Sequence, residues 1–96
     1  MANRILIIED EEKIARFVEL ELKHEGNEVE KAFDGREGLE KALSGCFDLI
    51  LLDVMLPDED GLEVVKKLRM RADTKTIPVL MVTAKSTELD KVKGLD

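Results

Sequence analysis

Acidic side chains follow directly on two strongly apolar segments of the chain. Asp53 comes after the run at residues 49–52, and the pair Glu9 and Asp10 comes after the run at residues 5–8. Short apolar runs of this kind are typical of buried parallel strands, which present binding residues at their carboxyl ends. If the two strands lie side by side, three carboxylates meet in one crevice, where their mutual repulsion requires a bound cation or a proton.

Three such carboxylates would suit Mg²⁺, which prefers hard oxygen ligands and keeps several of its waters. The metal would neutralise charge on a transferring phosphoryl group, so that one carboxylate becomes a usable nucleophile towards phosphorus. We assign that role to Asp53, which stands alone at its strand end, and predict that Glu9 and Asp10 are metal ligands. Thr83 ends a later apolar run. Its hydroxyl would hydrogen-bond an acylphosphate on Asp53, so its position would depend on the phosphate.

Each of these residues also has a purely structural interpretation. Residues 9–12 could simply place favourable negative charge at the start of a helix. Asp53 could cap the turn that follows it, and Thr83 could be an ordinary β-branched residue leaving a strand. The coincidence of all of them on one rim of one sheet favours a site over these alternatives.

The rest of the sequence predicts the elements that would position this site. Apolar segments predict strands at residues 5–8, 28–33, 49–52 and 79–82, and the mixed composition of 28–33 is typical of a sheet edge. Apolar stripes at helical spacing predict four helices, with Ile14, Phe17, Val18 and Leu22 before Gly26; Leu39, Ala42 and Leu43 before Gly45; Leu62, Val65 and Leu68; and Leu89, Val92 and Leu95 after Ser86. Alternation of strand and helix with short connections predicts an α/β fold with a doubly wound parallel sheet.

Local signals refine this outline. Asp34 and Glu37 have the spacing of a capping box at the start of the second helix. Gly61 is expected to supply the backbone freedom with which the third helix starts. Met55, Met70 and Met81 are expected to fill gaps in the core.

Composition limits the classes of function. The 96 residues, 44% of them hydrophobic, predict one domain spanning residues 1–96. Fifteen Lys and Arg against 22 Asp and Glu give a net charge of −7, which argues against direct binding to nucleic acid. No apolar stretch suits a membrane span or a secretory leader, so we expect a cytoplasmic protein without a membrane partner. The single cysteine, Cys46, cannot form an internal disulfide.

Together these features resemble the receiver domain of two-component response regulators. The resemblance rests on the two acid-terminated runs, on Met55, Leu56 and Pro57 with Gly61 after them, and on Thr83 and Ala84 after the last strand. It implies a flavodoxin-like, five-stranded sheet and an aspartate that takes a phosphoryl group from a histidine kinase in a Mg²⁺-dependent step. On this sequence it implies the following roles: Asp53 as phosphoacceptor, Glu9 and Asp10 as the acidic pair at the metal, Met55 as a backbone-carbonyl ligand, and Thr83 as the switch hydroxyl.

The resemblance also implies an incomplete fold, with four β/α units and without the last strand and helix. Receiver domains have a further strand and helix, roughly 20 to 25 residues by usual element lengths. They also have a lysine after that strand, and none of Lys85, Lys91 and Lys93 takes its place. Residues 79–82 would then form an exposed apolar edge, and one face of the sheet would be covered by the first helix alone. We therefore expect self-association, or binding of a complementary segment, through this edge.

The expected function is a phosphorylatable signalling module with only self-directed chemistry, and not an enzyme acting on other substrates. Two alternatives stay open. An aspartate-nucleophile phosphohydrolase also uses a strand-end carboxylate with Mg²⁺, but usually has a second Asp two residues on, where this chain has Met55. A non-signalling assembly or engineered fragment would use the same fold without receiving phosphate.

Overall fold

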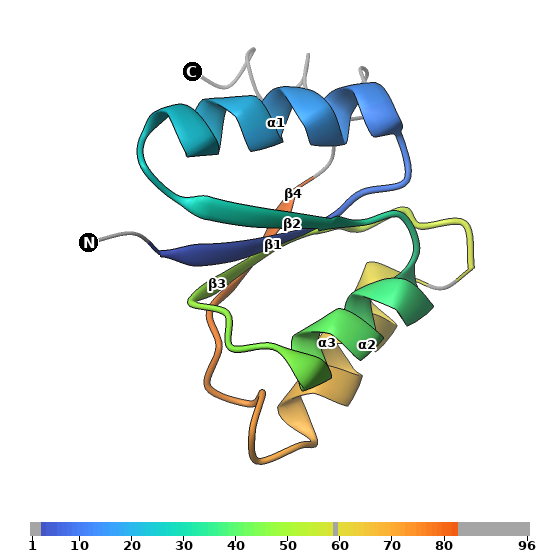
Figure 1. The fold of residues 1–96 in the computed structure, drawn as a ribbon. Helices are drawn as coiled ribbons and strands as arrows, with labels where there is room; N and C mark the ends of the chain where they lie inside the picture. Colours follow the sequence, from blue (N-terminus) through green and yellow to red (C-terminus); the bar gives the residue numbers. More distant parts are fainter. Residues whose placement is uncertain (1–2, 59, 83–96) are drawn as a thin grey trace, which may run out of the picture.

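Strand and helix alternate along the chain, as the sequence predicts. The computed structural model describes residues 3–58 and 60–82. The strands are β1 (Arg4–Ile8), β2 (Glu28–Ala32), β3 (Leu49–Asp53) and β4 (Val79–Val82), and the helices are α1 (Glu12–His24), α2 (Gly35–Ser44) and α3 (Gly61–Arg69). All strand pairs are parallel, in the order β2-β1-β3-β4. Helix α1 lies on one face of the sheet, and α2 and α3 lie on the other (Figure 1). The fold is therefore the predicted doubly wound α/β fold.

The two strongest apolar runs form the central strands. β1 and β3 are neighbours, and their register pairs Ile8 with Leu52. Strands that are buried on both faces have continuous apolar sequences, which is why these two segments could be assigned to central strands from the sequence. β2, with its charged residues, is an edge strand, as predicted. Because β1 and β3 are parallel and in this register, the residues that follow Ile8 and Leu52 emerge at the same edge of the sheet.

The main core lies between the sheet and the pair α2 and α3. Its buried residues come from all three layers: Leu6, Ile8, Ala32, Ala42, Phe47, Ile50, Leu52, Val64, Leu68 and Ile77. On α3 the fully buried apolar side chains are Val64 and Leu68, whereas Leu62, predicted to face the core, is exposed. The predicted stripe was therefore wrong at Leu62 and right at Leu68, and Val65 is partly buried against the core. The reason is that Gly61 packs against the end of β3 and sets which side of the helix faces the sheet.

Helix α1 packs on the sheet through small and charged residues. Ala15 and Glu19 are its buried residues. The carboxylate of Glu19 forms ion pairs with the ammonium groups of Lys23 and Lys31, each with a nitrogen-to-oxygen distance of 3.0 Å. These two ammonium groups, that of Lys31 first, lower the pKa of Glu19. Phe17, predicted to lie on the packed stripe, is 64% exposed. The other three residues of the predicted stripe are half-buried.

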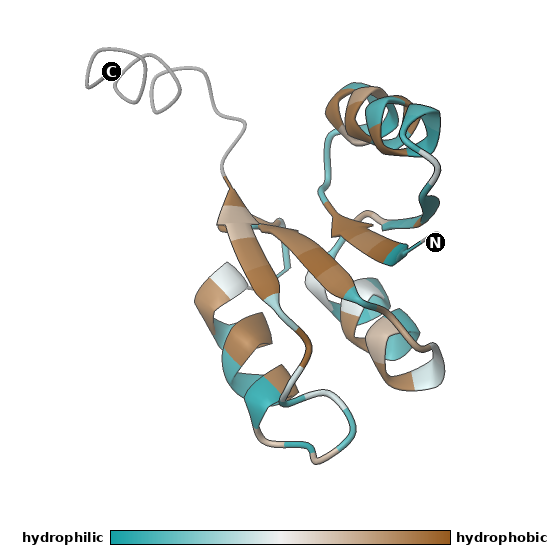
Figure 2. Ribbon diagram, turned by 90° about the vertical axis from the view of Figure 1, so that its left-hand side faces the viewer, coloured by the Kyte–Doolittle hydropathy of each residue, from teal (hydrophilic) through white to brown (hydrophobic). Residues whose placement is uncertain are grey.

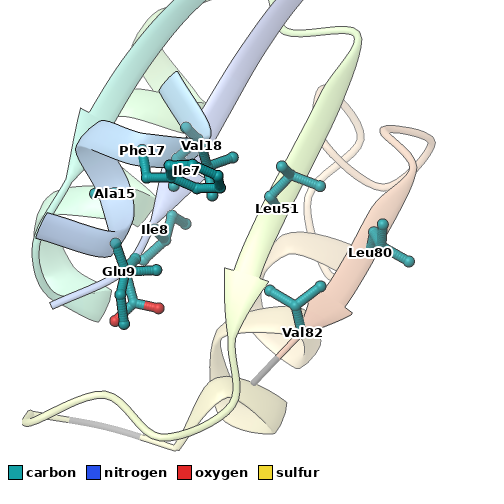
Figure 3. A pocket seen from close by; sticks show the side chains of 10 residues that line it. Ile7, Ile8, Glu9, Ala15, Phe17, Val18, Leu51, Leu80 and Val82 are labelled. Atoms are coloured by element: carbon teal, nitrogen blue, oxygen red, sulfur yellow. The ribbon is translucent and has the colours of Figure 1, made fainter. Parts of the chain in front are cut away.

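The stripe faces an apolar groove beside α1. The groove has a volume of about 400 Å³ and runs over β3 and β4. It is lined by side chains of the helix and of three strands, among them Ile7, Ile14, Val18, Leu51, Leu80 and Val82 (Figure 3). Within residues 3–82, α1 is the helix that covers this face, and the strands beyond it are strongly hydrophobic (Figures 1 and 2). The apolar surface that the sequence predicts on this face is therefore present.

The ends of the helices follow the predicted local signals. Asp34 caps α2 by accepting a hydrogen bond from the Glu37 amide at 2.7 Å, and Glu37 in turn accepts one from the Phe33 amide at 2.9 Å. Gly26, with a φ of 93°, follows the end of α1, and Gly45 is the C-cap of α2. Cys46 is exposed in the connection from α2 to β3. Among the helices that the structure describes, none has both the length and the apolar composition needed to cross a membrane.

Candidate metal and phosphoacceptor site

The three predicted carboxylates come together at the carboxyl edge of the sheet. Glu9, Asp10 and Asp53 each offer an oxygen atom, and these atoms lie within 4.8 Å of one another. Glu9 and Asp53 are only 4% and 1% exposed, and Asp10 is half-buried. The cluster therefore combines side chains from the ends of two neighbouring strands, as the sequence predicts.

Backbone amides hold two of these carboxylates in place. The amide of Glu9 donates to the carbonyl oxygen of Ala32 at 2.9 Å, which extends the pairing of β1 with β2 by one residue. The side chain of Glu9 then accepts a hydrogen bond from the Glu11 amide at 3.0 Å. Asp53 accepts one from the amide of Met55 at 3.1 Å. Both carboxylates are thus oriented by the chain that directly follows them.

Crowding and burial make the negative charge of the cluster costly. Burial raises the pKa of Glu9 to about 7, against the opposing effect of the Glu11 amide, and the nearby Asp10 and Asp53 raise it further. Near neutral pH a proton and a cation would therefore compete for this carboxylate. This is the electrostatic signature expected of a binding site for positive charge.

The surroundings of the carboxylates leave room for a hydrated cation. A hollow of about 470 Å³ adjoins Asp10 and is lined by the loop from β3 to α3, at Val54, Met55, Leu56, Pro57 and Asp60. Carboxylate and backbone oxygens suit a hard divalent cation such as Mg²⁺, which keeps several of its waters, better than a metal that prefers nitrogen or sulfur ligands. The donor set therefore fits the predicted metal.

The loop after β3 is closed tightly on itself. The amide of Gly61 donates to the carbonyl oxygen of Val54 at 3.0 Å, and Met55 and Asp60 form an isolated antiparallel bridge. A Cβ atom at position 61 would lie 2.7 Å from the carbonyl oxygen of Asp53. Gly26 is the glycine with positive φ among the described residues, so Gly61 is required for space and not for the backbone freedom that was predicted.

The predicted site residues fall into three groups. Glu9, Asp10 and Asp53 converge. Met55 adjoins them through its amide, but the residue is 58% exposed, so the prediction that it fills the core was wrong. The physical reason is that it lies on the outward turn of the closed loop. The same prediction was wrong for Met70, which is 81% exposed at the end of α3. Thr83 and the predicted helix after Ser86 lie outside the described residues.

The sequence matches a known family over most of its length. The family model of the response regulator receiver domain matches residues 5–96. The response regulator ArlR of Staphylococcus saprophyticus is 54% identical over 94 residues, which are 98% of this chain and 41% of that protein. The chain thus spans about two fifths of the length of the curated relatives it matches.

Solved structures agree with this match. The chemotaxis response regulator CheY4 of Vibrio cholerae superposes with a TM-score of 0.84 at 38% identity, covering 98% of this chain and 78% of that one. The receiver domain of sensor histidine kinase PA1611 of Pseudomonas aeruginosa superposes with a TM-score of 0.83 at 26% identity, covering 96% and 75%. That structure has a magnesium ion coordinated in its active site cleft.

Proposed function

This chain belongs to the response regulator receiver domain family, and from that premise we propose that Asp53 accepts a phosphoryl group from a histidine kinase. The observation that supports the proposal is the convergence of Glu9, Asp10 and Asp53 at the end of two central strands. Its chemistry would be limited to its own phosphorylation and to loss of the phosphoryl group to water. We further propose that the kinase is met in the cytoplasm.

The geometry supports a direct transfer to Asp53. A carboxylate oxygen of Asp53 would form a bond to phosphorus while the bond from phosphorus to the donor imidazole nitrogen breaks and its electron pair returns to the imidazole. The Met55 amide, 3.1 Å from Oδ1 of Asp53, would hold the carboxylate in one orientation during this exchange. The product is an acylphosphate on a side chain that is 1% exposed, and its burial would limit the access of water.

We assign Mg²⁺ to the same cluster. Glu9, Asp10, Asp53 and the backbone carbonyl of Met55 would hold it, and when bound it would neutralise charge on the transferring phosphoryl group. The pKa of Glu9, raised first by burial and then by its acidic neighbours, supports this assignment, because a bound cation would offset the cost of the negative charge as a proton does. The magnesium ion in the PA1611 receiver domain supports it from a relative.

Thr83 is proposed as the residue that senses the phosphoryl group. It directly follows Val82, the last residue of β4, and β4 pairs with β3 so that Val82 lies opposite Asp53. A hydroxyl one residue beyond this pair would be near enough to hydrogen-bond a phosphoryl oxygen on Asp53. Its movement on phosphorylation would couple the chemistry to the shape of the domain.

Phosphorylation can be tested with a small phosphodonor. The protein is incubated with acetyl phosphate and Mg²⁺, and its intact mass is measured. We expect a gain of one phosphoryl group, located by peptide mapping to the segment that contains Asp53, and no gain when EDTA replaces Mg²⁺. Continuous release of phosphate over many turnovers would instead indicate the phosphohydrolase, and absence of any adduct would indicate a fold used without phosphorylation.

We also propose that two copies of this chain associate through β4. Among the described strands β4 is the last in the sheet, and its four residues carry no charge, whereas β2 at the other edge carries Glu28, Glu30 and Lys31. Charged side chains protect a sheet edge from pairing with another chain, and β4 lacks that protection. Leu80 and Val82 continue the apolar surface from this edge into the groove beside α1. The edge and the groove would therefore be buried together.

Analytical ultracentrifugation tests this association. We expect a dimer at high protein concentration, and we expect Leu80→Lys to shift the equilibrium to monomer while far-UV circular dichroism stays unchanged. A Leu43→Lys change on α2, an exposed leucine on the other face of the sheet, should leave the association unaffected. A wild-type chain that remains monomeric throughout would contradict the proposal, and a dimer that survives Leu80→Lys would place the interface elsewhere.

A further inference from the structure

A carboxylate on the loop after β3 reaches a helix that is distant in the sequence. Asp58 accepts hydrogen bonds from two backbone amides at the start of α2, that of Gly35 at 2.8 Å and that of Arg36 at 3.1 Å. Both donors lie more than twenty residues earlier in the chain. Hydrogen bonds from amides at a helix start to a charged carboxylate are among the stronger ones in proteins. Asp58 therefore fastens the loop to α2.

Helix α2 does not depend on Asp58 for its ordinary cap. Asp34 already accepts a hydrogen bond from the Glu37 amide at 2.7 Å, and the side chain of Glu37 accepts one from the Phe33 amide at 2.9 Å. This capping box does not satisfy the amides of Gly35 and Arg36. The carboxylate of Asp58 accepts the hydrogen bonds from both of them. Two carboxylates thus share one helix start, one from the helix's own segment and one from the loop beside the carboxylate cluster.

The loop transmits this anchoring to the site. Its two ends are joined by the bond from the Gly61 amide to the Val54 carbonyl and by the bridge between Met55 and Asp60. Asp58 lies between those closures, and Met55 lies at the first of them. The amide of Met55 is also the group that orients Asp53. The position of the Met55 backbone is therefore set from one side by Asp53 and from the other by a closed loop whose tip is fixed to α2.

We infer that Asp58 is a positioning residue, which holds the Met55 backbone where it can serve Asp53 and a divalent cation. This inference rests on the proposed function, because it concerns the geometry of the same site. Asp58 itself is exposed and binds α2, so its effect on the cation would pass through the loop. It predicts that the affinity for Mg²⁺ depends on a side chain whose partners belong to another helix.

Two alanine variants, each of which loses one carboxylate at the start of α2, test the inference. Asp58→Ala and Asp34→Ala each remove one carboxylate from the same helix start, and each therefore changes the charge and the capping of α2 in a similar way. Only Asp58→Ala releases the loop. By isothermal titration calorimetry we expect Asp58→Ala to weaken Mg²⁺ binding about 3- to 10-fold, at or below the smallest effects seen when direct support of metal ligands is removed, because Asp58 acts through the loop. Asp34→Ala should change it less than about 2-fold. Asp58→Asn, which keeps one acceptor oxygen, should fall between wild type and Asp58→Ala.

Hydrogen exchange of the metal-free protein gives an independent readout. The amides of Met55 and Gly61 should exchange faster in Asp58→Ala than in Asp34→Ala, because their hydrogen bonds are those that the anchored loop maintains. Equal effects of the two alanine variants on binding and exchange would overturn the inference, since capping of α2 alone would then explain them. Unchanged binding and exchange in Asp58→Ala would overturn it as well. If wild type bound no Mg²⁺, the proposed metal site would fail, and the exchange rates at Met55 and Gly61 would still decide the role of Asp58.

Discussion

Asp53→Asn is expected to reduce phosphorylation by acetyl phosphate to background, because the neutral amide lacks the carboxylate oxygen that attacks phosphorus. The fold should survive the change. The amide oxygen of Asn can still accept the Met55 hydrogen bond, and one buried negative charge beside Glu9 is removed. Intact mass after incubation with Mg²⁺ and the phosphodonor measures the loss, and thermal unfolding followed by circular dichroism measures stability. We expect complete loss of the adduct with a melting temperature equal to or above that of wild type.

Asp48→Asn is the matched control for this change. Asp48 directly precedes β3, at the opposite end of the strand from Asp53, and it accepts a hydrogen bond from the Arg4 amide at 2.8 Å. The same chemical substitution there should leave phosphorylation intact. An adduct that persists in Asp53→Asn, mapped to another residue, would show that a different side chain accepts the phosphoryl group.

The second large effect is a loss of stability of the metal-free protein as the pH rises. The pKa of Glu9 is about 7 in the folded chain, above its ordinary value of 4.5. A raised pKa means that the folded state holds a proton that the unfolded chain releases. The contribution to stability is therefore complete below pH 4.5 and is lost as the pH rises through about 7. A shift of this size corresponds to about 3 kcal/mol in the free energy of unfolding.

Urea unfolding followed by circular dichroism across this pH range, in EDTA, measures the effect. Glu9→Gln should remove most of the slope and leave the metal-free protein more stable than wild type at pH 8. Glu19 provides the contrast, because its pKa is lowered by Lys31 and Lys23. Its contribution is present above pH 4.5 and is lost on acidification, so Glu19→Gln should alter the acid side of the profile. Equal stability of metal-free wild type at pH 5 and pH 8 would contradict the assignment to Glu9.

Added Mg²⁺ should reduce the loss at high pH. A ligand that binds only the folded state raises the free energy of unfolding. Once the ligand concentration exceeds the dissociation constant, this increase grows with the logarithm of the concentration. Binding should also release a proton from Glu9 near neutral pH, because the cation and the proton compete for the same carboxylates. The stabilisation by Mg²⁺ should therefore be larger at pH 8 than at pH 5, and should be greatly reduced in Asp53→Asn.

The sheet and the carboxylate cluster could be predicted from the sequence because their signals are local. Each central strand is a short run of apolar residues, and each run ends in an acid. Once both strands are assigned to the interior of one parallel sheet, the meeting of Glu9 and Asp53 follows from the geometry of parallel pairing. The cap at Asp34 was equally local, since its partner Glu37 lies three residues away.

The features that the sequence did not reveal depend on contacts between distant segments. The predicted stripe of α1 is half-buried except at Phe17, which is exposed, and the residues buried most deeply on this helix are Ala15 and Glu19. The prediction for Gly61 was backbone freedom at the start of α3, whereas the glycine makes room for the end of β3. The bonds from the start of α2 to Asp58 leave no pattern at all in the sequence. An unsatisfied pair of amides at that helix start is the physical reason to look for such an acceptor.

Because the strands are parallel, the exposed thiol of Cys46 and the carboxylate cluster lie at opposite edges of the sheet. Cys46, its single thiol, is exposed just before β3, near the amino ends of the strands, whereas the carboxylates gather at their carboxyl ends. A maleimide dye attached there would leave Glu9, Asp10 and Asp53 untouched. Because the chain has neither tryptophan nor tyrosine, this label would supply the optical signal that its own side chains lack.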